Sequence, residues 1–153
     1  KVTYDPKAPD EVTTDLEVFY TDSGAPKVRI YAKLAETYSS PEMVTKLKDG
    51  IKVYFYDEEG KVISTLTALY GEVRTSKGEM FVRDSVQLYN HLKKQRMETE
   101  ELNWNQNDSL IYTDKNVVVR SPDGVVYGHG IRTKQDFSNY TFYRPTGKFK
   151  SNK

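Results

Sequence analysis

Apolar and polar side chains alternate along most of this chain, in runs short enough to be β-strands. Ile51, Val53 and Phe55 alternate with Lys52 and Tyr54. Similar runs lie at residues 16–20, 28–32, 62–68, 117–119 and 125–126. Because a period of two sends successive side chains to opposite faces of a sheet, the pattern predicts roughly ten or more strands of about five residues. Two stretches have a weakly helical pattern. We interpret residues 40–47 as a short turn or bulge, and residues 84–95 as a strand that runs into a basic loop.

Short polar segments, most of them with a glycine, separate these runs at intervals typical of hairpins. They lie at residues 22–24, 57–60, 76–78, 105–108 and 122–124. Glycine adopts the positive φ angles that tight hairpin turns require. Turns at this spacing indicate an all-β fold of the antiparallel sandwich or barrel type.

One hairpin pattern occurs twice. Tyr20 to Gly24 is followed by Ala32, and Tyr56 to Gly60 is followed by Ala68, so the two copies are offset by 36 positions. Residues 121–128 form a looser third copy. Hairpins that repeat side by side build an elongated β-structure, and we expect one here.

Composition narrows the possible functions. The chain has 153 residues, enough for one domain with a real core, and a net charge of +1, which creates no field that would attract nucleic acid. The absence of cysteine excludes disulfides, thiolate zinc sites and a cysteine nucleophile. The chain begins at Lys1 and contains no apolar run that could span a bilayer, so we expect an N-terminal piece to have been removed.

No group of side chains has the spacing of a catalytic or metal site. His91 and His129 lack partners at metal-ligand spacing, and we read His129 as an exposed strand residue beside a bulge. The acidic residues 57–59 are read as a solvated hairpin tip, since acid–base catalysis needs carboxylates in different environments. Lys93, Lys94 and Arg96 are read as a solvated loop. We therefore predict no enzyme activity, no metal and no cofactor.

The apolar sheet face permits two outcomes. Without helices to cover it, such a face must fold onto itself. A closed interior is simply a core, whereas an open one is a groove for acyl chains, in which each buried methylene contributes about 0.8 kcal/mol. The alternation does not distinguish these outcomes.

Three blocks of the chain, taken in order, resemble the periplasmic domain of the LptC family of lipopolysaccharide-export proteins. The resemblance covers about residues 12–147. The blocks are residues 50–68, residues 98–114 with Leu102-Asn103-Trp104 and Ile111-Tyr112-Thr113-Asp114, and residues 122–147 with Tyr127-Gly128-His129-Gly130.

This resemblance implies a fold and a set of partners. The fold would be a twisted, open antiparallel β-jellyroll or sandwich, as one domain over residues 12–150 after an extended lead-in at residues 1–11. The protein would lie in the periplasm, tethered to the inner membrane by an N-terminal anchor that is not in this chain. It would receive lipopolysaccharide from the membrane subunits of an ABC transporter, hold the lipid A acyl chains, and pass the lipid to an LptA-like periplasmic protein.

Two sets of site residues follow from the resemblance and the alternation. The side chains on one face of the strands are predicted to line the lipid groove. The early and late terminal strands are predicted to pair edge to edge with partners, the early strand with the transporter and the late strand with the LptA-like protein. The groove residues are Ile51, Val53, Phe55, Val62, Leu66, Phe81, Leu102, Trp104, Val117, Val119, Val126 and Ile131. The edge residues are Leu16, Val18 and Tyr20 in the early strand, and Phe137, Tyr140 and Phe142 in the late strand.

An alternative function remains open at this point. A closed β-sandwich could bind a polysaccharide or a protein on its surface, with exposed tyrosines as a stacking platform. The tyrosines in question are Tyr54, Tyr56, Tyr112 and Tyr127.

Overall fold

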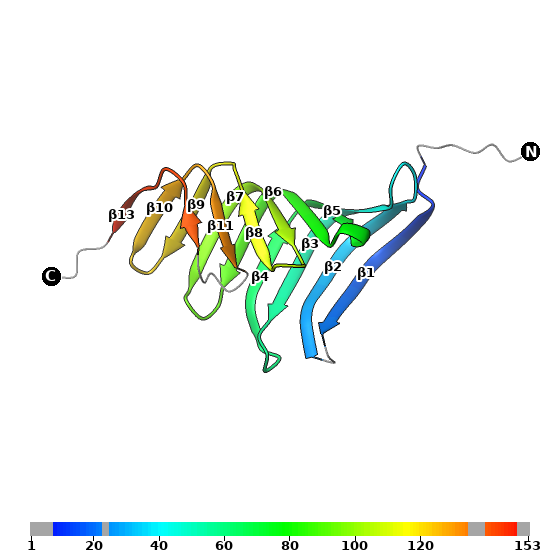
Figure 1. The fold of residues 1–153 in the computed structure, drawn as a ribbon, viewed down its shortest axis with the longest axis horizontal. Coiled ribbons are helices and arrows are strands. Elements are labelled where there is room, and N and C mark those ends of the chain that lie inside the picture. Colours follow the sequence, from blue (N-terminus) through cyan, green and yellow to red (C-terminus); the bar gives the residue numbers. More distant parts are fainter. Residues whose placement is uncertain (1–7, 23–24, 135–139, 150–153) are drawn as a thin grey trace, which may run out of the picture.

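The computed structural model describes residues 8–22, 25–134 and 140–149, and nearly all of them belong to antiparallel strands (Figure 1). The all-β fold predicted from the sequence is confirmed. The strands are β1 (Glu11–Asp22), β2 (Ala25–Tyr38), β3 (Val44–Tyr56), β4 (Val62–Ala68), β5 (Tyr70–Arg74), β6 (Glu79–Asn90), β7 (Gln95–Asn105), β8 (Leu110–Thr113), β9 (Val117–Ser121), β10 (Gly124–Gly128), β11 (Ile131–Lys134), β12 (Thr141–Phe142) and β13 (Thr146–Phe149). A short 3₁₀ turn, η1 (Thr75–Lys77), joins β5 to β6.

Long strands divide their pairing between two layers. In β3, residues 51–56 pair with β4, whereas residues 45–47 pair with β5. In the same way β6 pairs with both β4 and β5, and β7 pairs with both β9 and β8. We call the layer with β4, β9, β10 and β13 the first sheet, and the layer with β5, β8, β11 and β12 the second sheet. Strands that bend and continue in a second sheet make the corner of such a sandwich.

Aspartates in the left-handed backbone region mark the bends. Asp15, Asp49 and Asp84 have φ angles of 51°, 66° and 70°, and Gly50 follows Asp49 with φ 111°. The pairing register breaks at or next to these positions in β2–β3 and in β6–β7. Bulges of this kind bend a strand and increase its twist, and Asp tolerates the left-handed conformation better than most residues. Because the long strands run through both sheets, they are longer than the five residues expected from the sequence.

The core lies between the two sheets. One row of inward side chains runs directly across the first sheet from β1 to β10, and Val53, Leu88 and Met97 at its centre are fully buried. The row consists of Val18, Ile30, Val53, Leu66, Leu88, Met97, Val119 and Val126. Facing pairs of this type are the main stabilising unit of a sheet. The molecule is elongated along the direction of this row, with β1 at one end and β13 at the other (Figure 1).

Candidate functional site

Most of the predicted groove residues lie on the inward faces of the two sheets. The buried ones are Ile51, Val53, Phe55, Leu66, Leu102, Trp104, Val117, Val119 and Ile131. Val126 is half-buried and lies opposite Val119, so it shares the inward face of the first sheet. The structure thus brings these side chains together in one interior, while their role in lipid binding stays a prediction.

Two predicted groove residues lie on outward faces. Phe81 alternates with the buried Met80 and Val82, which places its half-buried ring on the outside of the second sheet. A register shift in the β3–β4 hairpin pairs Val62 with Tyr56, on the outer face of the first sheet. These placements differ from the expectation because alternation alone does not reveal which parity is inward, or where a bulge inverts it.

The interior is filled at the middle of the molecule. The Phe55 ring from the first sheet meets the Trp104 ring from the second sheet edge to face, with centroids 5.7 Å apart. Near the bend, a Cβ on Gly71 of β5 would lie 2.8 Å from Cδ1 of Ile51 in β3. The backbone of β5 can approach Ile51 this closely only because residue 71 has no side chain. The sheets are in direct contact here.

The end of the molecule that carries β10, β12 and β13, here called the closed end, is also filled. A Cβ on Gly128 of β10 would lie 2.6 Å from Cδ1 of Phe142 in β12. The Phe142 ring therefore occupies the space between the sheets at this end. Phe142 packs against the core and is half-buried.

The other end, formed by β1 and its neighbours and here called the open end, holds a cavity of about 340 Å³ between the sheets. We call it the groove cavity. Its first-sheet wall is apolar and includes Leu16, Val18 and Ile30, whereas its second-sheet wall mixes Ala35 and Leu47 with threonines. The full lining is Glu11, Thr13, Leu16, Val18, Tyr20, Ile30, Ala35, Thr37, Thr45, Leu47, Val73 and Thr75. Most of these residues were missed from the sequence, although the alternation in residues 16–20 and 28–32 pointed to part of the wall.

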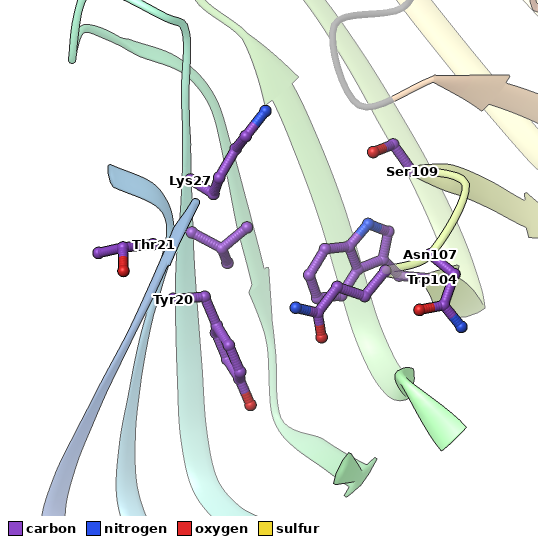
Figure 2. Close-up of a pocket in the computed structure, with 8 residues that line it drawn as sticks. Tyr20, Thr21, Lys27, Trp104, Asn107 and Ser109 are labelled. Atoms are coloured by element: carbon purple, nitrogen blue, oxygen red, sulfur yellow. The ribbon is translucent and has the colours of Figure 1, made fainter. Parts of the chain in front are cut away.

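A second cavity of about 400 Å³, the mouth cavity, lies between the β1–β2 end and the β7–β8 turn (Figure 2). Tyr20 lines both cavities, and burial raises the pKa of its hydroxyl. Trp104, which is 8% exposed, also lines the mouth cavity, and its Nε1 donates no hydrogen bond to any described residue. The described residues that line it are Tyr20, Thr21, Lys27, Val28, Trp104, Gln106, Asn107 and Ser109.

Strands at both ends of the molecule have one unpaired edge. Within the described residues, β1 pairs only with β2, and β13 pairs only with β10. The predicted edge residues Leu16, Val18 and Tyr20 lie on β1, and their inward side chains line the groove cavity. Their binding role stays a prediction.

The late edge differs in its details from the expected strand at residues 137–143. Phe137 lies outside the described residues. Tyr140 is exposed and meets Phe142 edge to face at 5.7 Å, but the described strand here spans only Thr141–Phe142. The outermost strand of the first sheet is β13, which the sequence does not reveal because residues 146–149 lack clear apolar alternation.

The tyrosines of the alternative reading are spread over separate surfaces. Tyr54 and Tyr56 lie on the outside of the first sheet, where Tyr56 stacks on Phe19 with centroids 6.3 Å apart. Tyr112, opposite Asn103, lies on the outside of the second sheet, and Tyr127 lies on β10 near the closed end. The four rings therefore do not form one stacking platform.

Two of the titratable groups that were weighed as catalytic candidates, Asp57 and His91, have structural partners. Oδ1 of Asp57 accepts hydrogen bonds from the backbone N–H groups of Glu59 and Lys61, which closes the β3–β4 turn. His91 Nε2 lies 2.7 Å from the Thr65 hydroxyl. No cluster of three or more potential metal ligands occurs among the described residues. In the same part of the chain, no helix has the length and apolarity to cross a membrane.

The geometry is that of a binding module with an apolar interior, and the comparison with known families agrees with it. No curated protein matches this chain. Residues 1–144 match the family model described as "Lipopolysaccharide-assembly, LptC-related". This family consists of transport and binding proteins rather than enzymes, and it implies a role in lipopolysaccharide transport and a periplasmic location. Since the match spans nearly the whole chain, the protein belongs to the LptC family.

Proposed function

We propose that the domain holds the acyl chains of lipopolysaccharide between its two sheets, entering at the open end. The observation that supports this most directly is the groove cavity, whose first-sheet wall consists of apolar side chains on the edge strand and its neighbour. Each methylene transferred from water to such a wall contributes about 0.8 kcal/mol, so an acyl chain can be held there without charged contacts.

The two unpaired edges support a place for the domain in a chain of partners. In this proposal, β1 adds to a strand of the transporter's membrane subunits, and the opposite edge adds to an LptA-like periplasmic protein. An N-terminal anchor preceding this chain tethers the domain to the inner membrane. Onward transfer through the closed end then requires Phe142 to leave its position over Gly128.

The groove is tested with a matched pair of substitutions on β1. Val18→Glu places a charge in the groove cavity, whereas Phe19→Glu places one on the outer face, where Phe19 is 43% exposed. Val18 is preferable to Val53 or Leu66, because a charge at those buried positions unfolds the domain. Binding of labelled lipopolysaccharide is measured, with lipid A-free glycan as the competitor.

We expect Val18→Glu to abolish binding and Phe19→Glu to leave it nearly unchanged, with no competition by the glycan. Equal binding by both folded variants, or competition by lipid-free glycan, contradicts the proposal.

The edge of β1 is tested with prolines at two successive positions, Glu17→Pro and Val18→Pro. In an antiparallel pair, the N–H groups of successive residues point alternately toward the partner strand and away from it. One proline therefore breaks a bond to β2 and lowers stability, while the other alters only the free edge. We expect the stable variant to lose association with the transporter subunits, and intact association contradicts the edge assignment.

A further inference from the structure

The mouth cavity contains a buried hydrogen-bond donor without an acceptor. Nε1 of Trp104 is inaccessible to solvent and has no partner among the described residues, although the ring itself is held against Phe55. Buried N–H groups are nearly always paired in folded proteins, because an unpaired one loses its hydrogen bonds to water without replacement. To pair with this donor, an acceptor that enters the cavity must displace the atoms that cover the nitrogen.

A lysine lines the same cavity as this donor. Lys27 lines the same cavity and forms no ion pair with any described residue, whereas Lys48 pairs with Glu36 and Arg120 pairs with Glu98. No acidic residue is among the described residues that line the cavity. Figure 2 shows Lys27 and Ser109 on either side of the indole, with the indole nitrogen on the ring edge toward the gap between them.

The donors come from separate elements and converge on one space. Lys27 lies on β2, Trp104 on β7, and Ser109 in the turn before β8. An ammonium group, an indole N–H and a hydroxyl together suit an anion with acceptor oxygens in several directions, and a phosphate has this geometry. A planar carboxylate presents fewer such directions.

The same cavity adjoins the apolar groove. Tyr20 forms part of the wall of both cavities, and Val28 gives the mouth cavity an apolar side chain next to Lys27. The two cavities are therefore neighbours, so the acyl chain of a ligand whose anionic group binds at the mouth lies close to the groove cavity. This arrangement is characteristic of a site for an amphipathic ligand and not for a free ion.

We propose that the mouth cavity binds a phosphate group of the acylated ligand, with Trp104 Nε1 as a hydrogen-bond donor and Lys27 Nζ as the counter-charge. The proposal rests on the proposed function, in that the acyl chains of the same ligand occupy the groove cavity. It adds a polar recognition site to an interior that otherwise selects only for apolarity.

The test uses the fluorescence of Trp104, which is the single tryptophan of the chain and lies in the site itself. The probes are lipid A and the same lipid A after enzymatic removal of its phosphates, presented in the same detergent. We expect the unaltered domain to bind the phosphorylated form about tenfold more tightly, as one charge-assisted hydrogen bond provides. Lys27→Gln should remove most of this preference, and Lys115→Gln, at an exposed lysine in the β8–β9 turn, should retain it.

Trp104→Phe tests the indole N–H while keeping an aromatic ring against Phe55. Its affinities are measured by calorimetry, since the fluorescent group is gone. We expect it to lose the preference for phosphate, so that it binds the two lipid A forms with similar affinity. If this variant does not fold, Lys27→Gln decides the test, because an exposed lysine can be replaced without disturbing the core.

The remaining outcomes separate this inference from the proposed function. Equal binding of both lipid A forms by the unaltered domain overturns the phosphate site and leaves the acyl groove intact. Binding of neither form overturns the proposed function and this inference together. Competition by inorganic phosphate as effective as that by phosphorylated lipid A shows a free-anion site and overturns the assignment to a lipid phosphate.

Discussion

The two ends of the molecule differ in their strands and in their interiors. At the closed end Phe142 fills the space over Gly128, whereas the open end retains a cavity of about 340 Å³. In one inward row of the second sheet, the side chains increase in size from β2 to β7. The row runs Thr37, Thr45, Val73, Met80, Trp104. The threonines of β2 and β3 leave room for the cavity at the open end, whereas the Trp104 ring fills the middle against Phe55.

The largest effect expected is a contrast between two leucines of the first sheet. Leu88 is fully buried at the middle, while Leu16 is half-buried beside the groove cavity. Leu88→Ala should cost about 2–5 kcal/mol of the free energy of unfolding, as truncations in packed cores do. Leu16→Ala should cost roughly half of that or less, because a cavity is already present. Urea unfolding of both variants measures the difference, and equal costs contradict an open end.

A single added methyl should disturb the closed end. In Gly128→Ala the new Cβ meets the Phe142 ring, so the ring must move, and we expect a loss of about 1–3 kcal/mol. In Gly128→Ala combined with Phe142→Ala the clash is absent, so the two costs should not add. Additive costs in urea unfolding show that Phe142 does not fill this space.

Three added carbons should be tolerated at the open end. Ala35 lines the groove cavity, so the larger side chain in Ala35→Leu has room to enter it. We expect the free energy of unfolding to stay within about 1 kcal/mol of its original value, and the affinity for lipopolysaccharide to fall as the cavity is filled. A stable variant with unchanged affinity places the acyl chains elsewhere.

The smallest effect expected is an alkaline one at Tyr20. Burial raises the pKa of this hydroxyl above its unfolded value of about 10, so the neutral form is favoured in the folded state. Its stabilising effect is full below that unfolded pKa and is lost as the pH rises through the folded pKa. Tyr20→Phe removes the ionisable group, so the unaltered domain should lose stability relative to this variant only at alkaline pH. Parallel unfolding curves across the alkaline range measure this, and a constant difference contradicts the burial of Tyr20.

The sequence was most informative about strands and turns, because a single physical signal governs each of them. Alternation in residues 51–55 follows from one buried and one exposed face, and the glycine at position 60 follows from the positive φ of its turn, 85° in the structure. The bends were not predictable, since Asp15, Asp49 and Asp84 are ordinary polar residues in sequence. Their left-handed backbone is imposed by the meeting of two sheets.

The candidate site was only partly predictable for the same reason. Alternation identified the inward row through Val53 and Leu66, but Phe81 was assigned to the wrong face of its sheet. The alternation separates the two faces of a strand, and only the packing of the sheets determines which face is inward. The unpaired N–H of Trp104 depends on the absence of any acceptor near it, which is a property of the assembled interior. Neither the residue type nor the neighbouring residues in the sequence indicate whether this N–H group has an acceptor.

The bent strands also determine where the chain can change in length. One residue inserted between Gly50 and Ile51 would turn Ile51, Val53 and Phe55 to solvent while leaving residues 44–48 in place, since facing inverts with each single-residue shift. The two halves of a strand that is shared between the sheets must therefore keep a fixed register relative to each other. Insertions and deletions should therefore be tolerated best at the hairpin tips, such as residues 57–60, where they leave the register of the interior unchanged.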